Sequence, residues 1–326
     1  MSARATGLSR RRFIGGLAVA GLARPALAQQ YPSQDLHFVC AFPPGSSSDA
    51  IVRFMAEKIK PLARRTILVE NRFGASGNVA VEYVMRSRPD GHTIFVHGPS
   101  GIAANMHVFK KPPIDAAKEV QVAAAIHRQA FMMAIDAKRP WKTLAEVTAY
   151  LKDKGDKATY ASYASTATVM GELYKQATGT KAVEVVYRVG QDTLNDLSTG
   201  ALDYGMYDPV FAMAQAREGR LRIMAASTGQ RLQAAADVPT MAELGVPMDL
   251  TGWFGAMVPV ATPRPILETI NGWFRTVVAT DEAKVFLNRF GGDPWLAGID
   301  EAQARFLKDI ADWKDYVRIA KIKPQG

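Results

Sequence analysis

The chain has 326 residues, of which 48% are hydrophobic and 22% charged, a composition typical of a globular protein with one large or two medium domains. Its formal net charge of +9 falls to +4 (35 bases against 31 acids) without the first 28 residues, which carry five arginines and no acid. That mild excess fits anionic small molecules and does not indicate nucleic acid, while the single cysteine, Cys40, excludes an intramolecular disulfide.

The first 28 residues have the features of an export signal. Residues 9–14 form a twin-arginine pattern, residues 14–22 form an apolar run, and residues 26–28 offer small side chains for cleavage. The apolar run is too short for a permanent membrane span, and no later stretch approaches that length. We therefore expect a twin-arginine signal peptide over residues 1–28, export to the periplasm, and a soluble mature protein.

A loop at residues 42–49 joins a buried strand, expected over 36–41, to a helix expected over 49–62. Such a turn presents free backbone N–H groups and the positive end of the helix dipole, which suits an anion. Its serines add hydroxyl donors that carry no charge. The alternative is an ordinary Pro-Gly turn with a serine helix cap. The candidate ligand contacts here are Phe42, Gly45, Ser46 and Ser47.

The following elements alternate between strands and helices. Strands are expected over 66–69 and 93–96, with a glycine-flanked turn at 74–77 and a helix over 78–87 between them. The glycines lack the Gly-x-Gly-x-x-Gly spacing of a dinucleotide site. The alternation predicts a mostly parallel sheet with helices on its faces.

Ser100 lies just beyond the strand at 93–96. A nucleophile elbow requires Gly-x-Ser-x-Gly, but Ile102 occupies the position of the second glycine, so a catalytic serine is not favoured. Open α/β sheets bind ligands at the carboxyl ends of their strands. We therefore expect Ser100 to be a hydroxyl donor to a ligand.

A second unit repeats the plan of the first. Two apolar runs occupy residues 122–135, and Thr143 with Glu146 forms a capping box that opens a helix. A short strand at 159–162 then leads into a hydroxyl-rich turn and a helix over 169–178. A Ser/Thr helix cap is again the simpler explanation, but two such turns suggest a ligand held between them. The candidate contacts are Tyr163, Ser165, Thr166 and Thr168.

Further strands are expected over 183–187, 201–207 and 221–226. Asp208 ends the second of them, and it is either a helix cap or a contact to a ligand hydroxyl or amine. The C-terminal part is expected to form helices over residues 265–278, 281–290 and 300–319.

Several short motifs resemble those of the tripartite tricarboxylate transporter substrate-binding proteins, the Bug family of periplasmic receptors. In order, they occupy residues 42–45, 69–72, 89–91, 187–188, 237–240, 253–255 and 262–263. The resemblance implies a two-lobed, type II periplasmic-binding-protein fold, in which each lobe is a mixed, mostly parallel sheet flanked by helices. It also implies that two loops, here 42–49 and 160–168, bind the ligand carboxylate through backbone amides, hydroxyls and ordered water.

The same resemblance suggests a division of the chain after the signal peptide. Lobe 1 is expected over 29–125 plus 255–326 and lobe 2 over 126–254, with hinge crossings near 122–135 and 250–260. The binding loops depart from the family pattern, because Ser46 replaces a usual glycine and the second loop lacks glycine and carries Tyr163. These changes offer more hydroxyls and one more aromatic ring.

The leading hypothesis is an extracytoplasmic solute receptor. It would bind a small organic acid, a mono- or dicarboxylate with aromatic acids included, and deliver it to the membrane permease subunits of a tripartite tricarboxylate transporter. One alternative is a ligand-responsive periplasmic partner of a sensor protein, since that role needs the same closing lobes. A periplasmic hydrolase is less favoured, because no catalytic motif is met and the five histidines form no metal pattern. We expect no cofactor, no metal and a monomer.

Overall fold

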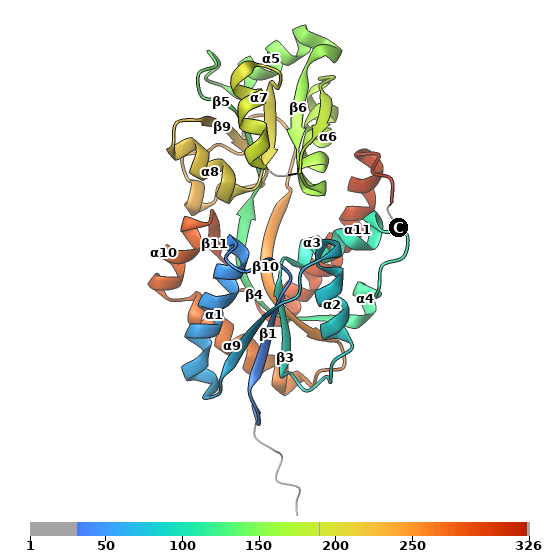
Figure 1. The fold of residues 1–326 in the computed structure, drawn as a ribbon, viewed down its shortest axis with the longest axis vertical. Helices are drawn as coiled ribbons and strands as arrows, with labels where there is room; N and C mark the ends of the chain where they lie inside the picture. The colour runs from blue at the N-terminus through green and yellow to red at the C-terminus, as the bar shows by residue number, and fades with distance from the viewer. Residues whose placement is uncertain (1–30, 189, 325–326) are drawn as a thin grey trace, which may run out of the picture.

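The computed structural model describes residues 31–188 and 190–324, so the expected signal peptide lies outside the described residues. Two β-sheets, each flanked by helices, form two lobes that lie one above the other in Figure 1. The expectation of two α/β lobes is therefore confirmed. Within the described ranges, no helix combines the length and the apolar character that crossing a membrane requires.

The first lobe, in the lower half of Figure 1, contains a six-stranded sheet with the order β11-β4-β10-β3-β1-β2. Its strands are β1 (Leu36–Cys40), β2 (Ile67–Asn71), β3 (Thr93–His97), β4 (Val120–Ala130), β10 (Thr251–Pro259) and β11 (Gly292–Pro294). One face of the sheet packs against α1 (Ser47–Ala63), α9 (Arg264–Val278) and α10 (Asp281–Arg289). The other face packs against α2 (Asn78–Met85), α3 (Pro99–Val108), α4 (Ala116–Glu119) and α11 (Ile299–Ile319).

The second lobe contains a five-stranded sheet with the order β7-β6-β8-β5-β9. Its strands are β5 (Met132–Asp136), β6 (Thr159–Ser162), β7 (Val183–Val186), β8 (Tyr204–Tyr207) and β9 (Leu221–Ala226). The helices around it are α5 (Leu144–Lys154), α6 (Ser165–Thr178), α7 (Thr193–Thr199) and α8 (Pro209–Arg217).

Both sheets are mixed, as expected, but parallel pairs do not predominate in either. In the first lobe β1 pairs in parallel with β2 and β3, whereas β10 runs antiparallel to β3 and β4, and β11 to β4. In the second lobe β6 pairs in parallel with β7 and β8, whereas β5 runs antiparallel to β8 and β9. Every antiparallel pair includes β4, β5 or β10. These are the strands at which the chain passes from one sheet to the other. Alternation of strands and helices along the sequence did not reveal them.

The chain passes between the sheets twice. Phe131 separates β4 of the first sheet from β5 of the second, and residues 227–250 lead from β9 back to β10. Strand β4 remains in the first sheet as far as Ala130, beyond the lobe boundary expected at residues 125 and 126. The reason is its antiparallel pairing with β10, which extends to Thr251.

Local sequence explains most helix ends, and the main differences from expectation are the start of α6 and the helices α3, α4 and α8. Helix α6 begins at Ser165 and not at residue 169, because the hydroxyl-rich turn forms the first turn of the helix. Helix α3 was not expected at all, since Pro99–Val108 has almost no amphipathic periodicity. Its first helical residue is a proline, whose fixed φ suits that position. The three C-terminal helices lie within a residue of their expected bounds.

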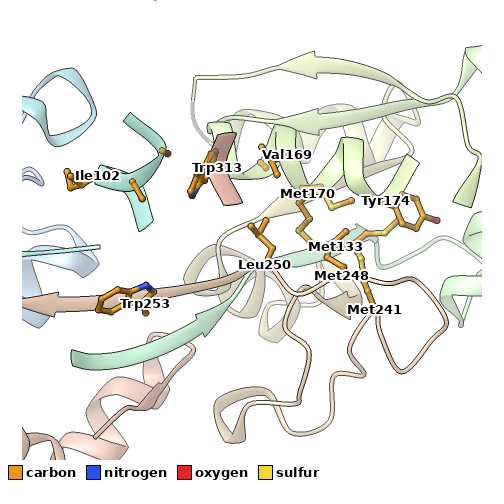
Figure 2. Packing of buried hydrophobic residues seen from close by; sticks show 14 of the residues in the cluster. Ile102, Met133, Val169, Met170, Tyr174, Met241, Met248, Leu250, Trp253 and Trp313 are labelled. Atoms are coloured by element: carbon orange, nitrogen blue, oxygen red, sulfur yellow. The ribbon is translucent and has the colours of Figure 1, made fainter. Parts of the chain in front are cut away.

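One hydrophobic cluster is shared by the two lobes. It joins Trp253 of the first sheet to Met133 of the second through Leu250 and through Trp313 of α11. Figure 2 shows Trp313 next to Val169 of α6, with Leu250 close by. The lobes therefore share apolar packing on the side of α11, and the starts of α3 and α6 lie near this packing.

Candidate functional site

The first candidate loop, residues 42–49, is fixed by the side chain of Asp49. This carboxylate is 2% exposed and accepts hydrogen bonds from Gly45 N at 2.9 Å, Asn71 Nδ2 at 2.7 Å and Arg53 Nε at 2.9 Å. Burial raises its pKa, but the bonds from Arg53, Asn71 and Gly45 outweigh burial and hold the pKa below its usual value. Asn71 also donates to Phe42 O at 2.9 Å, so both ends of the loop are attached to the end of β2.

This arrangement leaves two backbone amides of α1 available. Ser46 is the N-cap, and its Oγ accepts from Asp49 N at 3.2 Å. The amides of Ser47 and Ser48 have no hydrogen-bond partner among the described residues. Gly45, with φ +80°, turns the chain into the helix, but its own amide is bonded to Asp49. The start of α1 therefore offers neutral donors at a positive helix end.

The start of α6 in the second lobe also leaves two backbone amides available. Ala164 is the N-cap and supplies no side-chain hydrogen bond, while Ala167 N and Thr168 N donate to Ala164 O. The amides of Ser165 and Thr166 have no partner within the described residues. Ser165 is exposed and Thr166 half-buried, so two hydroxyls accompany two free amides. Each lobe thus contributes one helix start with free amides and hydroxyls, and Arg53 near the start of α1 is paired with Asp49.

The structure brings Ser100 and Thr166 together. Both line a small pocket between the lobes, together with Phe131, the segment 249–252 and residues of α11. The pocket has a volume of about 20 Å³, which is room for about one water molecule and not for an organic acid. Thr166 and Ser100 belong to the first turns of α6 and α3, so the two helix starts face the same space.

The hydroxyl of Ser100 is bonded within the protein. It donates to Asp309 Oδ2 at 2.9 Å, and Trp253 Nε1 donates to the same oxygen at 2.7 Å. Arg305 pairs with the other oxygen of Asp309 at 2.7 Å and also donates to Thr251 O at 2.9 Å. Ser100 therefore connects α3 to α11 and β10, a role that no sequence pattern indicated because its partner is distant in the chain.

Tyr163 and Asp208 form a mutual pair. The tyrosine hydroxyl donates to Asp208 Oδ2 at 2.5 Å and accepts from Asp208 N at 2.8 Å. Asp208 Oδ1 in turn accepts from Phe211 N at 3.0 Å, so Asp208 is the N-cap of α8, one of the two roles expected for it. Burial, with Asp208 nearby, raises the pKa of Tyr163 far above its usual value, so the hydroxyl stays protonated. The pair fixes the loop before α6.

Thr168 also points into the protein. Its Oγ1 and the Oγ of Ser162 each donate to Glu184 Oε1 at 2.5 Å. This network attaches α6 to the strands β6 and β7. Phe42 is half-buried, and its ring lies against His97, with 4.7 Å between the ring centroids, and against Phe254 at 6.1 Å. Both side chains therefore support the helix starts from inside the lobes.

Sequence reasoning missed the residues that fix these loops. Asn71 could have been found, since it belongs to one of the motifs that carry the family resemblance. Asp309 had no such signal. Cys40 is buried, and burial raises the pKa of its thiol. Over residues 31–188 and 190–324, no three or more His, Cys, Asp or Glu side chains gather as they would around a metal ion.

Comparison with known proteins identifies relatives over nearly the whole chain. Residues 51–321 match the model of the tripartite tricarboxylate transporter family receptor. A UPF0065 protein of Bordetella bronchiseptica is 26% identical over 321 residues, covering 98% of this chain and 95% of that protein. Protein BugT of Bordetella pertussis is 25% identical, covering 93% of this chain and 94% of that protein.

Solved structures agree with the family match. The R. palustris protein Rpa4515, solved with adipate, is 26% identical, with a TM-score of 0.77 over 90% of this chain and all of that one (100%). The expected two-lobed periplasmic-binding-protein fold is thereby confirmed. The chain belongs to the tripartite tricarboxylate transporter receptor family, which is a family of periplasmic receptors and not of enzymes.

Proposed function

We propose that this protein is a periplasmic receptor that binds a small organic carboxylate between its lobes and delivers it to a membrane permease. One observation carries the proposal: α1 and α6, one from each lobe, begin with unpaired amides and hydroxyls. Two helix starts without an unpaired cation suit a carboxylate better than a phosphate dianion, since the one nearby cation that the structure shows, Arg53, is paired with Asp49. The adipate bound to Rpa4515, a relative of the same fold, supports a carboxylate ligand.

The contacts to the ligand are assigned to the free groups of the two helix starts. They are the amides and hydroxyls of Ser47 and Ser48 in α1 and of Ser165 and Thr166 in α6. The other predicted residues hold these groups in place, because their own polar atoms are bonded within the protein or, for Phe42, because the ring packs inside it. They are Phe42, Gly45, Ser46, Ser100, Tyr163, Thr168 and Asp208.

Ligand binding and closure of the lobes are coupled by simple energetics. Contacts to both helix starts exist together only when the lobes are close, so the acid shifts the population toward the closed form. A charge-assisted hydrogen bond contributes about 1.5–3 kcal/mol. Three or four of them, less the cost of ordering, give about −8 kcal/mol, which corresponds to micromolar affinity.

The direct test is thermal denaturation of the mature protein with a panel of acids. We expect at least one aliphatic or aromatic mono- or dicarboxylate to raise the melting temperature by several degrees, because a ligand at 100 times its Kd contributes about 2.7 kcal/mol. Stabilisation by amino acids or sugars alone would refute the carboxylate assignment.

Two variants locate the site in the same assay. Ser47→Tyr and Ser165→Tyr place bulk in the first turns of α1 and α6, where it blocks the free amides. Both variants should fold, but the acid should no longer raise their melting temperature. Glu301→Tyr, exposed in the first turn of α11, is the matched control and should keep it. Equal affinity in both site variants and the control would exclude the two helix starts.

We further propose that the chain is exported through the twin-arginine pathway. The support is the pattern at residues 9–14 with the apolar run and the cleavage residues behind it. Replacing Arg10 and Arg11 with lysine should stop accumulation of the mature protein in the periplasm, as followed by cell fractionation. Unchanged accumulation would point to another export route.

A further inference from the structure

His97 is a buried histidine beside the loop at residues 42–49. It is the last residue of β3, 6% exposed, and its ring stacks with Phe95 at 5.0 Å and lies against Phe42 at 4.7 Å between centroids. Phe42 opens the loop that leads to α1. His97 therefore lies directly behind the first binding loop, at the edge of the sheet where α1, α2 and α3 begin.

Neither ring nitrogen of His97 has a hydrogen-bond partner in the described part of the chain. Nδ1 is fully buried and unpaired. Burial lowers the pKa of the ring to about 3, so the imidazole is neutral at the pH of the periplasm. A buried polar atom without a partner is costly, and a position that retains one commonly has a functional reason.

The space beside Nε2 is kept open by two glycines. Nε2 lies 3.0 Å from the point that a Cβ on Gly77 would occupy and 3.6 Å from the corresponding point on Gly101. Gly77, with φ +93°, is the N-cap of α2, and Gly101 lies in the first turn of α3. Nε2 thus faces the starts of two helices, and Gly101 is only half-buried.

The location of the proton follows from the two environments. A neutral imidazole has one N–H and one bare nitrogen. An unpaired acceptor is tolerated better in a protein interior than an unpaired N–H. Nδ1, sealed among apolar groups, therefore remains bare, and Nε2 carries the hydrogen toward the glycines.

We propose that His97 Nε2–H donates a hydrogen bond to a second oxygen of the bound acid, beyond the carboxylate held by α1 and α6. The inference rests on the proposed function, because it concerns the same ligand. It makes His97 a specificity residue that favours an acid with an oxygen acceptor at its far end over a plain alkanoate. An apolar far end would leave the buried N–H unpaired.

The experiment compares matched acids by isothermal titration calorimetry and thermal shift: adipate with hexanoate, and succinate with butyrate. The wild type should bind at least one diacid about tenfold or more tighter than its monoacid, as expected for a hydrogen bond to a charged oxygen. His97→Leu should remove that preference. His97→Gln, whose amide nitrogen reaches a similar place, should retain part of it.

Two controls match the variants. His127 is also buried with Nδ1 unpaired, but its Nε2 lies 3.3 Å from Gln129 Oε1, so His127→Leu should keep the preference. Gly101→Ala puts a methyl group 3.6 Å from Nε2 without strain and should weaken diacid binding. Gly272→Ala, at an open position of α9, should leave diacid binding unchanged.

Ligand-free protein gives an independent readout. Nitrogen NMR should show His97 neutral and protonated at Nε2 from pH 5 to 8, and His97→Leu should not lower the melting temperature. A proton on Nδ1, or an unchanged diacid preference in His97→Leu, would overturn the inference while acid binding itself stands. Absence of any acid-induced shift in the wild type would overturn the proposed function and the inference with it.

Discussion

At the scale of single residues, the candidate site depends on one buried carboxylate whose oxygens are bonded within the protein. Asp49 accepts hydrogen bonds from Gly45, Asn71 and Arg53, so the Gly45 amide is not free for another partner. The serines that follow keep their amides free. The residue types of the loop were therefore readable from sequence, but which amide is available depends on a contact between β2 and α1.

Asp49→Asn should lower the free energy of unfolding by about 1–3 kcal/mol, because it weakens charge-assisted bonds to a buried group. The folded-state pKa of Asp49 is lowered, so its contribution is present above the unfolded pKa of about 4 and is lost as the pH falls through the folded pKa. Urea titrations at pH 7 and pH 3 test this.

The difference in stability between wild type and Asp49→Asn should accordingly be smaller at pH 3 than at pH 7. Glu57→Gln, at an exposed position of the same helix, is the control and should change stability by less than about 0.5 kcal/mol. A difference independent of pH would show that the charge of Asp49 is not what holds the loop.

At the scale of elements, caps and turns were the most predictable features. The capping box of α5 is present: Thr143 Oγ1 accepts from Glu146 N at 3.2 Å, and Glu146 Oε2 accepts from Thr143 N at 3.0 Å. Helix α6 was predicted to start too late, because its hydroxyl residues were assigned to a loop before the helix. The residue types identified the turn, but they did not show that the helix already begins within it, at Ser165.

Thr143→Ala should destabilise the protein by about 1 kcal/mol, the usual cost of losing an N-cap. The corresponding fall in melting temperature is about 2–4 °C, measured by circular dichroism or calorimetry. Thr143→Ser keeps the oxygen and should stay within about 0.5 kcal/mol of the wild type. Identical losses for alanine and serine would mean that the methyl group, and not the cap, matters.

At the scale of the whole molecule, α11 joins the two lobes. Trp313 is 2% exposed and belongs to the hydrophobic cluster that continues into both sheets, next to Val169 in Figure 2. Asp309, one turn earlier, holds Ser100 and Trp253 of the first lobe. Any movement of the lobes must therefore preserve or break packing around this helix.

Trp313→Ala should reduce the free energy of unfolding by about 3–5 kcal/mol, because it removes a large buried side chain and leaves a cavity. Leu307→Ala changes a half-exposed position on the same helix and should cost far less. Denaturant titrations followed by far-ultraviolet circular dichroism measure both. Equal costs for the two variants would show that the cluster does not couple the lobes.

The sequence by itself determined the α/β class, the order of most strands and helices, and the two hydroxyl-rich helix starts, because these depend on residues that are neighbours in the chain. Only the tertiary structure decided which groups are free to bind. Ser100 donates to Asp309, Thr168 donates to Glu184, and Asp208 caps α8. His97, in contrast, has no hydrogen-bond partner among the described residues. A hydrogen-bond donor is available to a ligand only if no partner from elsewhere in the fold reaches it first.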